Sequence, residues 1–279
     1  MNARVRERIF LVGCPRSGTT LLQSVLSANS HIISFPESHF FEQLFSGRTL
    51  LFRLGIVSHN ARKRWNEYLC EIERKELQSI LPRHAIFTHQ FSGALVQVFD
   101  TLTLEQGGSI WVEKTPGHLH YVESIENLIY GAKFVHILRE GVDVVASLFD
   151  TANTYPEGWG PGYRTIDQCI ERWLMDIRFS KACLSRENHA LVRYEDLIAD
   201  PSSVVIDLCK FIDVPFEGQM LEDYRNAAEE LILKNETWKS KTFQPIQAKG
   251  KSKFYEVFNR SQRDYILERI PNGPLEELN

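Results

Sequence analysis

The sequence GCPRSGTT, residues 13–20, directly follows the apolar run IFLV, residues 9–12. A short apolar run that ends in a glycine loop, with helical spacing after it, is typical of a buried strand, a turn and a helix. The turn has the two glycines and the hydroxyl residues of a phosphate-binding loop, but Thr19 stands where such a loop carries its lysine, and Arg16 lies inside it. The pattern predicts an anion-binding turn that uses an arginine.

The chemistry of this turn follows from its residue types. A glycine loop before a helix presents backbone N–H groups and the positive end of a helix dipole to an anion. Thr19 and Thr20 add hydroxyl donors in the first helical turn, and the guanidinium of Arg16 is a planar fork that suits a tetrahedral oxyanion. The alternative is an ordinary strand–turn–helix without a ligand.

Strands and helices alternate along the rest of the chain. Apolar runs and helical spacing predict strands at 9–12, 32–35, 110–112, 133–138 and 190–194, and helices at 19–29, 61–78, 91–106, 118–130, 141–150, 166–185, 202–212, 217–234 and 260–270. We expect loops at 151–164, which is rich in glycine and proline, and at 235–259, which is polar. This alternation predicts an α/β fold in three layers, with a parallel sheet covered by helices on both faces.

Polar motifs follow the predicted strands, at 13–20, 36–39, 113–116, 139–147 and 193–196. Ligands of open parallel sheets bind at the carboxyl ends of the strands. The coincidence of the motifs with these ends therefore predicts one site shared by all of them.

Bulk properties limit the setting of the protein. The 279 residues lie near the upper limit for one core, which predicts a single domain over 1–279. The net charge of −4 gives no basic field for nucleic acid, and no apolar run reaches the roughly 20 residues of a membrane span. Five scattered cysteines without a C-x-x-C pair favour a reducing compartment, so we expect a cytoplasmic protein. A symmetric homodimer is the default oligomer.

The charges at the predicted strand ends bear on metal use. A P-loop kinase would use the loop lysine and a magnesium ion held near an acidic strand end. Here a cation stands beside each carboxylate, in Glu113-Lys114 and Arg139-Glu140, and only Glu195-Asp196 fits the acidic partner. The pattern favours a site that binds anions directly, without a metal ion.

With these residues in hand, the chain resembles the PAPS-dependent sulfotransferases, where PAPS is 3′-phosphoadenylyl sulfate and PAP the product nucleotide. The resemblance spans residues 9–197 and rests on ordered motifs: PRSGTTLL at 15–22, PES at 36–38, EKTP at 113–116, Arg139 with Ser147, and VRYEDL at 192–197. The RSGTT loop is similar to that of bacterial and Golgi-type members, including tyrosylprotein sulfotransferases, rather than to the KSGTT loop of cytosolic ones. The resemblance implies a P-loop fold similar to that of nucleoside triphosphate hydrolases.

The resemblance also implies a nucleotide site. Arg16, Ser17, Gly18, Thr19 and Thr20 would hold the 5′-phosphosulfate of PAPS. The 3′-phosphate would be bound by Arg139 and Ser147, and the nucleotide would be approached by Tyr194 and by the segment Lys249-Gly250.

Each of these last assignments has an alternative. Arg139 would otherwise form a surface ion pair with Glu140 or Asp143, and Ser147 would be a small residue packed on the sheet. Tyr194 would be a core tyrosine, and residues 249–251 a solvated charged loop.

The predicted chemistry needs a base for the acceptor proton and cations for the leaving group. Glu37 lies 21 positions after Arg16, the same offset as the catalytic glutamate of tyrosylprotein sulfotransferases, so the resemblance implies that Glu37 is the base. His39 and His118 are rival bases, and the alternative for Glu37 is a carboxylate that stabilises a helix N-terminus. Lys114, together with Arg16, would stabilise the leaving group.

The acceptor site is the part that the sequence defines least. We expect residues 40–106 and the loop 151–165, with Tyr155, Trp159 and Tyr163, to form its walls and lid. An aromatic lid suits a small molecule, a lipid or a carbohydrate with a hydroxyl group. The alternatives to a sulfotransferase are a P-loop kinase and a non-catalytic protein that binds PAP.

Overall fold

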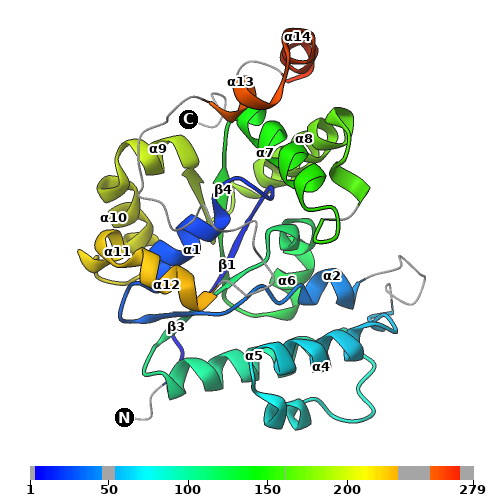
Figure 1. Ribbon diagram of the computed structural model, residues 1–279. Coiled ribbons are helices and arrows are strands. Elements are labelled where there is room, and N and C mark those ends of the chain that lie inside the picture. Colours follow the sequence, from blue (N-terminus) through cyan, green and yellow to red (C-terminus); the bar gives the residue numbers. More distant parts are fainter. Residues whose placement is uncertain (1–3, 46–53, 160, 232–251, 271–279) are drawn as a thin grey trace.

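The computed structural model describes residues 4–45, 54–159, 161–231 and 252–270. Its strands are β1 Glu7–Gly13, β2 Ile32–Ser34, β3 Ile110–Lys114, β4 Ala132–Leu138 and β5 His189–Arg193. They form one parallel sheet in the order β2-β3-β1-β4-β5, and Figure 1 labels its three central strands β3, β1 and β4.

Helices occupy most of the other described residues. The α-helices are α1 Thr19–Ser27, α2 Phe40–Leu44, α4 Ala61–Glu71, α5 Thr88–Glu105, α6 Val122–Leu128, α7 Gly141–Thr154, α8 Ile166–Cys183, α9 Tyr194–Ala199, α10 Pro201–Ile212, α11 Gln219–Glu222, α12 Tyr224–Leu231, α13 Lys253–Val257 and α14 Arg260–Arg269. The 3₁₀-helices are η1 Lys75–Ile80, η2 Pro116–Tyr121 and η3 Pro161–Tyr163.

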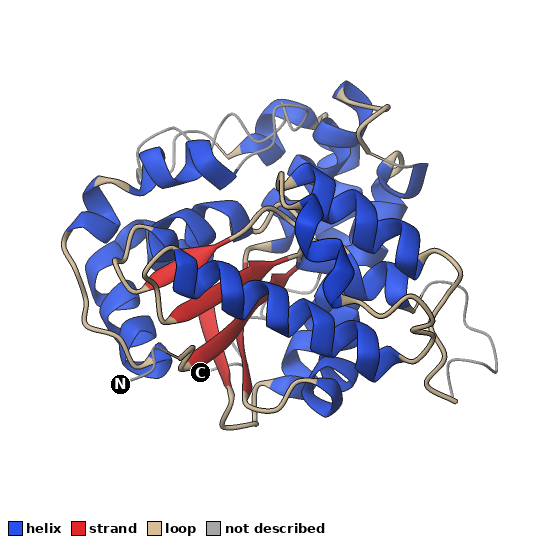
Figure 2. Cartoon of the chain, turned by 90° about the horizontal axis from the view of Figure 1, so that it is seen from below, coloured by secondary structure: helices blue, strands red, loops and turns tan. Residues whose placement is uncertain are grey.

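Strand β1 lies at the centre of the sheet because its side chains are apolar on both faces. Phe10 and Val12 contact the aromatic core that also includes side chains of α4, α5 and α6. Ile9 and Leu11 point to the opposite face and pack with side chains of α1, α10 and α12. The sheet therefore lies between two layers of helices (Figure 2), which confirms the three-layer α/β architecture.

A third apolar cluster lies beyond the carboxyl ends of the strands. It joins Cys14 of the β1–α1 turn and Leu138 of β4 to the buried faces of α7, α8, α13 and α14. Trp173 of α8 packs there, and its indole Nε1 donates to the carbonyl of Arg139 at 3.1 Å. This cluster fixes the two turns that carry Arg16 and Arg139.

The structure corrects several predicted boundaries. The helix expected at 61–78 ends at Glu71, because Glu73 takes a left-handed φ of 58° and η1 follows. The helix expected at 217–234 is divided at Asp223 into α11 and α12. The loop expected from Thr151 begins with the last turn of α7, and the irregular segment 235–259 contains α13.

The segment 40–106 contributes to the core as well as to the site. Helix α5 buries residues such as Phe91, Leu95 and Phe99 under the sheet.

Within the described ranges, no helix combines the length and the hydropathy that a membrane span requires.

Candidate active site

The polar motifs of the sequence meet at one edge of the sheet. Parallel pairing places Leu11 beside Lys114, Gly13 beside Ile137, and Leu138 beside Arg193. The β1–α1 turn, the end of β3 and the β4–α7 turn therefore lie next to one another. The predicted strand-end site is formed by neighbouring strands.

The β1–α1 turn presents unsatisfied donors. The hydroxyl of Ser17 is buried and has no hydrogen-bond partner, and Gly18, which precedes α1, has a φ of 97°. Thr19 and Thr20 begin α1, so their backbone N–H groups belong to its first turn. A buried hydroxyl without a partner beside a helix N-terminus fits an anionic group as its ligand.

Three side chains converge on Arg16, which itself takes a left-handed φ of 72°. Its Nε donates to Ser147 Oγ at 3.1 Å, and its guanidinium lies 6.0 Å from the centre of the Trp159 ring. Arg139 Nη1 donates to the carbonyl of Arg16 at 3.2 Å. Burial, and then the charge of Arg139, lower the pKa of Arg16 to about 10, so it stays cationic at neutral pH. Two arginines at this turn are an electrostatic cost that an anion would relieve.

Residues at the end of β5 pack against the β1–α1 turn and Arg139. The Tyr194 ring lies 4.4 Å below the guanidinium of Arg139, and a Cβ at Gly18 would come within 2.5 Å of that ring. The buried Nε atoms of Arg139 and Arg193 have no hydrogen-bond partner, and the nearest carboxylate oxygen to Arg193 Nε is Asp196 Oδ2 at 3.9 Å. The additional contact of Arg139 is with Asp143 at 3.8 Å, on the helix that follows. Ser17 after β1, Arg139 after β4 and Arg193 at the end of β5 thus provide donors that suit a ligand with more than one anionic group.

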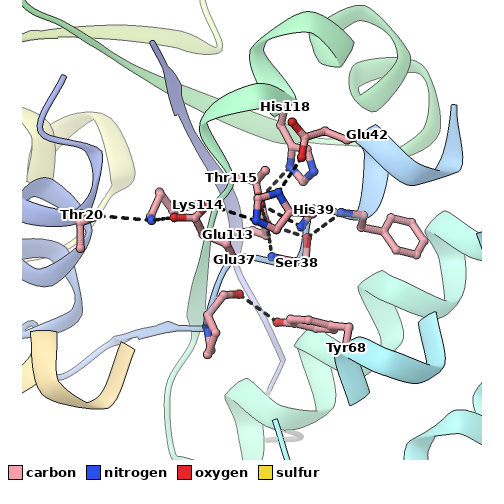
Figure 3. Close-up of polar contacts among 12 residues, drawn as sticks. Thr20, Glu37, Ser38, His39, Glu42, Tyr68, Glu113, Lys114, Thr115 and His118 are labelled. Atoms are coloured by element: carbon pink, nitrogen blue, oxygen red, sulfur yellow. Dashed lines mark hydrogen bonds and ion pairs between the residues drawn. The ribbon is translucent and has the colours of Figure 1, made fainter. Parts of the chain in front are cut away.

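Lys114 and Glu37 form the second part of the site (Figure 3). Lys114 is buried, and its Nζ forms an ion pair with Glu37 Oε1 and donates to Thr20 Oγ1 at 3.4 Å. Thr20 belongs to the helix behind the anion-binding turn, so the ion pair lies between that turn and the β2–α2 segment. Lys114 pairs with Glu37 rather than with the adjacent Glu113.

Glu113 has a different set of partners. Its carboxylate accepts hydrogen bonds from the Ser38 and Thr115 hydroxyls, both at 2.7 Å, and from His118 Nδ1 at 2.8 Å. Burial would raise the pKa of Glu113, but His118 and the two hydroxyls outweigh it and hold the pKa below its ordinary value. The other ring nitrogen of His118 accepts the Phe41 backbone N–H at 3.2 Å, and the imidazole is fully buried. His118 is therefore committed to structure and lacks the access that a base requires.

His39 occupies the open side of the site. Its Nε2 lies 3.4 Å from Glu37 Oε2, and its Nδ1 lies 2.6 Å from Glu42 Oε2. Unlike His118, its side chain is 45% exposed. Of the two rival histidines, only His39 remains close to the predicted base and accessible.

Glu42 and Gly117 are site residues that the sequence analysis missed. Glu42 lies three positions after His39 on α2, a spacing at which helical side chains meet, so the pattern could have been recognised. Gly117 is recognisable only in three dimensions, because a Cβ there would come within 1.9 Å of Glu42 Oε1. The predicted nucleotide contacts Lys249 and Gly250 lie outside the described residues.

Two aromatic residues of the predicted lid contact arginines: Trp159 lies near Arg16, and Tyr163 contacts Arg172 of α8. Tyr163 Oη accepts a hydrogen bond from Arg172 Nη1 at 2.7 Å, and Trp159 and Tyr163 contact each other edge to face.

Across the ranges described above, there is no group of three or more His, Cys, Asp or Glu side chains placed to hold a metal ion.

Comparison with known proteins shows the family of the chain. The sequence model of the Sulfotransferase family matches residues 8–218, and the chain belongs to this family. A protein-tyrosine sulfotransferase of Drosophila melanogaster is 24% identical over 255 residues, which are 88% of this chain and 46% of that protein. The chain thus spans about half the length of such curated relatives, and 56% of a protein-tyrosine sulfotransferase of Caenorhabditis elegans.

Solved structures show the same fold. The sulfotransferase domain of the curacin biosynthetic pathway superposes with a TM-score of 0.62 at 21% identity, covering 96% of this chain and 98% of that one. A mouse sulfotransferase complexed with PAP superposes with a TM-score of 0.55 at 13% identity, covering 96% of this chain and 85% of that one.

Proposed function

We propose that this protein transfers a sulfuryl group from PAPS to the hydroxyl of an acceptor and releases PAP. The observation that carries the proposal is the Lys114–Glu37 ion pair beside a turn in which the buried hydroxyl of Ser17 has no hydrogen-bond partner. A carboxylate for the acceptor proton and a cation for the leaving oxygen are thus adjacent to an anion site. PAPS supplies an activated sulfuryl group on a phosphate leaving group.

The arginines and hydroxyls of the strand ends fit a nucleotide with two separate phosphate positions. The 5′-phosphosulfate would lie at the N-terminus of α1, against the turn formed by Arg16, Ser17, Gly18, Thr19 and Thr20. Arg139 and Ser147 both contact Arg16, so a 3′-phosphate would lie next to the same turn. Tyr194 supports Arg139 from below. These contacts support the assignment of the 5′-phosphosulfate site and of the 3′-phosphate site that the resemblance implies.

Lys114 has two roles in this proposal. In the structure, it holds the carboxylate of Glu37 at the end of β3. Because it also reaches Thr20 on α1, its ammonium lies within reach of an oxygen that leaves toward the anion-binding turn. A buried lysine that can exchange between two anionic partners stabilises the charge that develops on the leaving group.

The acceptor is a molecule with a nucleophilic hydroxyl. His39, whose side chain is 45% exposed, lies beside Glu42, and Arg172, which acts on Glu42, donates a hydrogen bond to the aromatic Tyr163. This side of the site therefore offers both polar and aromatic contacts. Relatives described as protein-tyrosine sulfotransferases add phenolic hydroxyls of tyrosine to the small-molecule, lipid and carbohydrate hydroxyls that the sequence favoured.

Thermal unfolding with different nucleotides tests the proposal. We expect PAP at about 100 times its Kd to stabilise the protein by about 2.7 kcal/mol without magnesium, and ATP with magnesium to have little effect. Arg139→Ala should weaken PAP binding, whereas Arg178→Ala, which removes an exposed arginine of α8, should not. Stabilisation by magnesium–ATP instead of PAP would indicate a kinase.

Turnover is then measured with labelled PAPS and a panel of tyrosine peptides, phenols, aliphatic alcohols and carbohydrates. Transfer of label to a hydroxyl of the panel supports the proposal. PAP binding without transfer to any member of the panel would indicate a non-catalytic nucleotide-binding protein.

A further inference from the structure

We propose that Glu37 and His39 act as one proton-transfer pair in which Glu42 orients the imidazole, so that the proton taken from the acceptor leaves the site through His39. This inference rests on the proposed sulfuryl transfer. It changes the roles of the two residues: they are consecutive carriers of one proton rather than rival bases.

The geometry forms a chain of three side chains. Glu37 Oε1 is occupied by Lys114, whereas Glu37 Oε2 faces His39 Nε2 at 3.4 Å. The opposite ring nitrogen, Nδ1, lies 2.6 Å from Glu42 Oε2 (Figure 3). If Nδ1 carries the hydrogen that Glu42 accepts, the lone pair of Nε2 points toward Glu37. Glu42 therefore selects the imidazole tautomer that can accept a proton from Glu37.

The backbone of His39 is held in a sparsely populated conformation. His39 precedes α2 and has a left-handed φ of 49°, which is uncommon for a residue other than glycine. Its N–H donates to Thr115 Oγ1 at 3.2 Å, and its carbonyl accepts the Gln43 N–H at 3.3 Å. Backbone strain of this kind persists where the surrounding structure over-determines it, and it is concentrated at functional sites.

Gly117 makes room for the orienting carboxylate. A Cβ at Gly117 would come within 1.9 Å of Glu42 Oε1, so the carboxylate of Glu42 lies directly against the η2 backbone. The absence of a side chain at this one position thus allows Glu42 to reach His39. Gly117 is also a place where the chain can be disturbed without removing any titratable group.

Charges from three elements act on His39, and a charge from a fourth acts on its neighbour Glu37. Glu42 of α2 and Glu37 of the β2–α2 segment favour the imidazolium, while Arg64 of α4 opposes it. Lys63 and Glu67 of α4 line the same hollow, and Lys114 of β3 contacts Glu37. Burial alone would lower the pKa of His39, but the hydrogen bond with Glu42 and the two carboxylate charges outweigh it and raise the pKa. His39 is thus a stronger proton acceptor than an isolated imidazole.

Glu42 is held in its ionised form by its own neighbours. Burial would raise the pKa of Glu42, but the hydrogen bond and charge of His39, with further contributions from His118 of η2 and Arg172 of α8, lower it. An ionised Glu42 accepts the Nδ1 hydrogen throughout the physiological pH range.

The proton balance of the step is simple. As the acceptor oxygen bonds to sulfur and the sulfur–oxygen bond to the leaving phosphate breaks, the acceptor O–H proton moves to Glu37. It then passes from Glu37 to His39 Nε2, while the Nδ1 hydrogen stays on the bond to Glu42. The imidazolium releases one proton to solvent, which restores the starting state of both residues.

His39 has a path to solvent on its exposed side. It lines a hollow of about 350 Å³ together with Gln43, Asn60, Lys63, Arg64 and Glu67. A hollow with only polar lining residues can hold water that carries the proton away. Glu37, by contrast, is 12% exposed and is enclosed by Lys114 and His39, so release through His39 is the more open route.

The decisive variant is His39→Asn. Asparagine tolerates the left-handed backbone, and its amide can still donate to Glu42, but it has no group that accepts a proton at the position of Nε2. We expect kcat with the best acceptor of the panel to fall about 10²-fold while PAP binding is retained. The matched control His84→Asn changes an exposed histidine and should leave both unchanged.

Two further variants test the orienting role. Glu42→Gln and Gly117→Ala should each move the NMR titration of the His39 ring to lower pH, and the acid limb of the kcat–pH profile should move with it. Gly93→Ala is the control, because a Cβ at Gly93 has no neighbour within 4 Å. A purely structural role of Glu42 would lower the melting temperature without moving either titration.

The outcomes separate this inference from the function on which it rests. Wild-type kcat and an unchanged acid limb in His39→Asn would overturn the proton-transfer pair while sulfuryl transfer stands. If Glu42→Gln leaves the pH of the His39 titration unchanged, the proton-transfer pair is also overturned. This measurement does not depend on turnover. PAP binding without transfer to any acceptor overturns the proposed function and the pair together, whatever the titration shows.

Discussion

The edge of the sheet holds two carboxylate–imidazole pairs that have different environments. Glu113 and His118 are 2.8 Å apart, and both side chains are fully buried. Glu37 and His39 are 3.4 Å apart, and 45% of the His39 side chain is exposed. The chemical groups are the same, and both histidines have a neighbour at each ring nitrogen, but His118 is enclosed whereas His39 lines a polar hollow. Solvent access, rather than residue type, separates the buried pair from the pair for which we propose proton transfer.

The difference originates in strand β3. Glu113 and Lys114 are consecutive, so their side chains point to opposite faces of the sheet. Glu113 points toward η2 and α2, where hydroxyls and an imidazole surround it. Lys114 points toward α1 and the β2–α2 segment, where it meets Thr20 and Glu37. Strand β3 thus contributes Glu113 to the buried Glu113–His118 pair, which we call the closed pair. The next residue, Lys114, binds Glu37 of the Glu37–His39 pair, which we call the open pair.

The largest expected effect separates the pairs by activity. We expect Glu37→Gln to lower kcat about 10²- to 10⁴-fold, because the amide cannot accept the acceptor proton. PAP affinity should stay close to that of the wild type, since the amide oxygen can still accept from Lys114, while the melting temperature should fall because the buried ammonium loses its counter-charge. Labelled-PAPS turnover and calorimetry with PAP measure these quantities. Near-normal turnover would show that Glu37 is not the base.

The next effect separates the pairs by stability. Glu113→Ala leaves His118 and two hydroxyls unsatisfied in the interior, so we expect a loss of about 3–5 kcal/mol in the free energy of unfolding. Chemical denaturation measures this loss. Because the pKa of Glu113 is held below its ordinary value, its stabilising contribution is present above about pH 4.5 and is lost as the pH falls through the lowered pKa. A Glu113→Ala protein of wild-type stability would contradict the structural role of the closed pair.

The smallest effect concerns a third imidazole, remote from the open pair. His136 of β4 is buried between Ser180 and His189, and burial, followed by the charges of His189 and Arg186, lowers its pKa to about 3. The unfolded chain binds a proton at pH 6.5 that the folded protein excludes, so stability decreases as the pH falls below this value. Between pH 6.5 and about pH 5 we expect a loss of about 1–2 kcal/mol.

His136→Asn should flatten this decline, whereas His39→Asn should not, because the pKa of His39 is raised. Urea unfolding at a series of pH values measures both. An equally steep decline in His136→Asn would assign the acid sensitivity to other groups.

The sequence predicted the architecture because the signals that carry it are local. The apolar run 9–12, the glycine turn at 13–20 and the helical spacing after it need no long-range information. Boundaries were predicted less well where the backbone leaves the helical angles at one residue, as at Glu73 with a φ of 58° and at Asp223 with a φ of −105°. Helix α13 was missed because Lys253–Val257 is a single turn within a polar stretch, and its position depends on contacts with α7.

The sequence by itself determined which chemical groups stand at the ends of the strands, because parallel strands bring their carboxyl ends to one edge whatever the details of packing. Only the tertiary structure decided how those groups are paired. Lys114 binds Glu37 instead of Glu113, His118 is enclosed and His39 remains accessible. Pairing and exposure depend on side-chain directions and on contacts between residues far apart in the chain, as when Gly117 admits Glu42 to the site. No local pattern in a single sequence encodes such contacts.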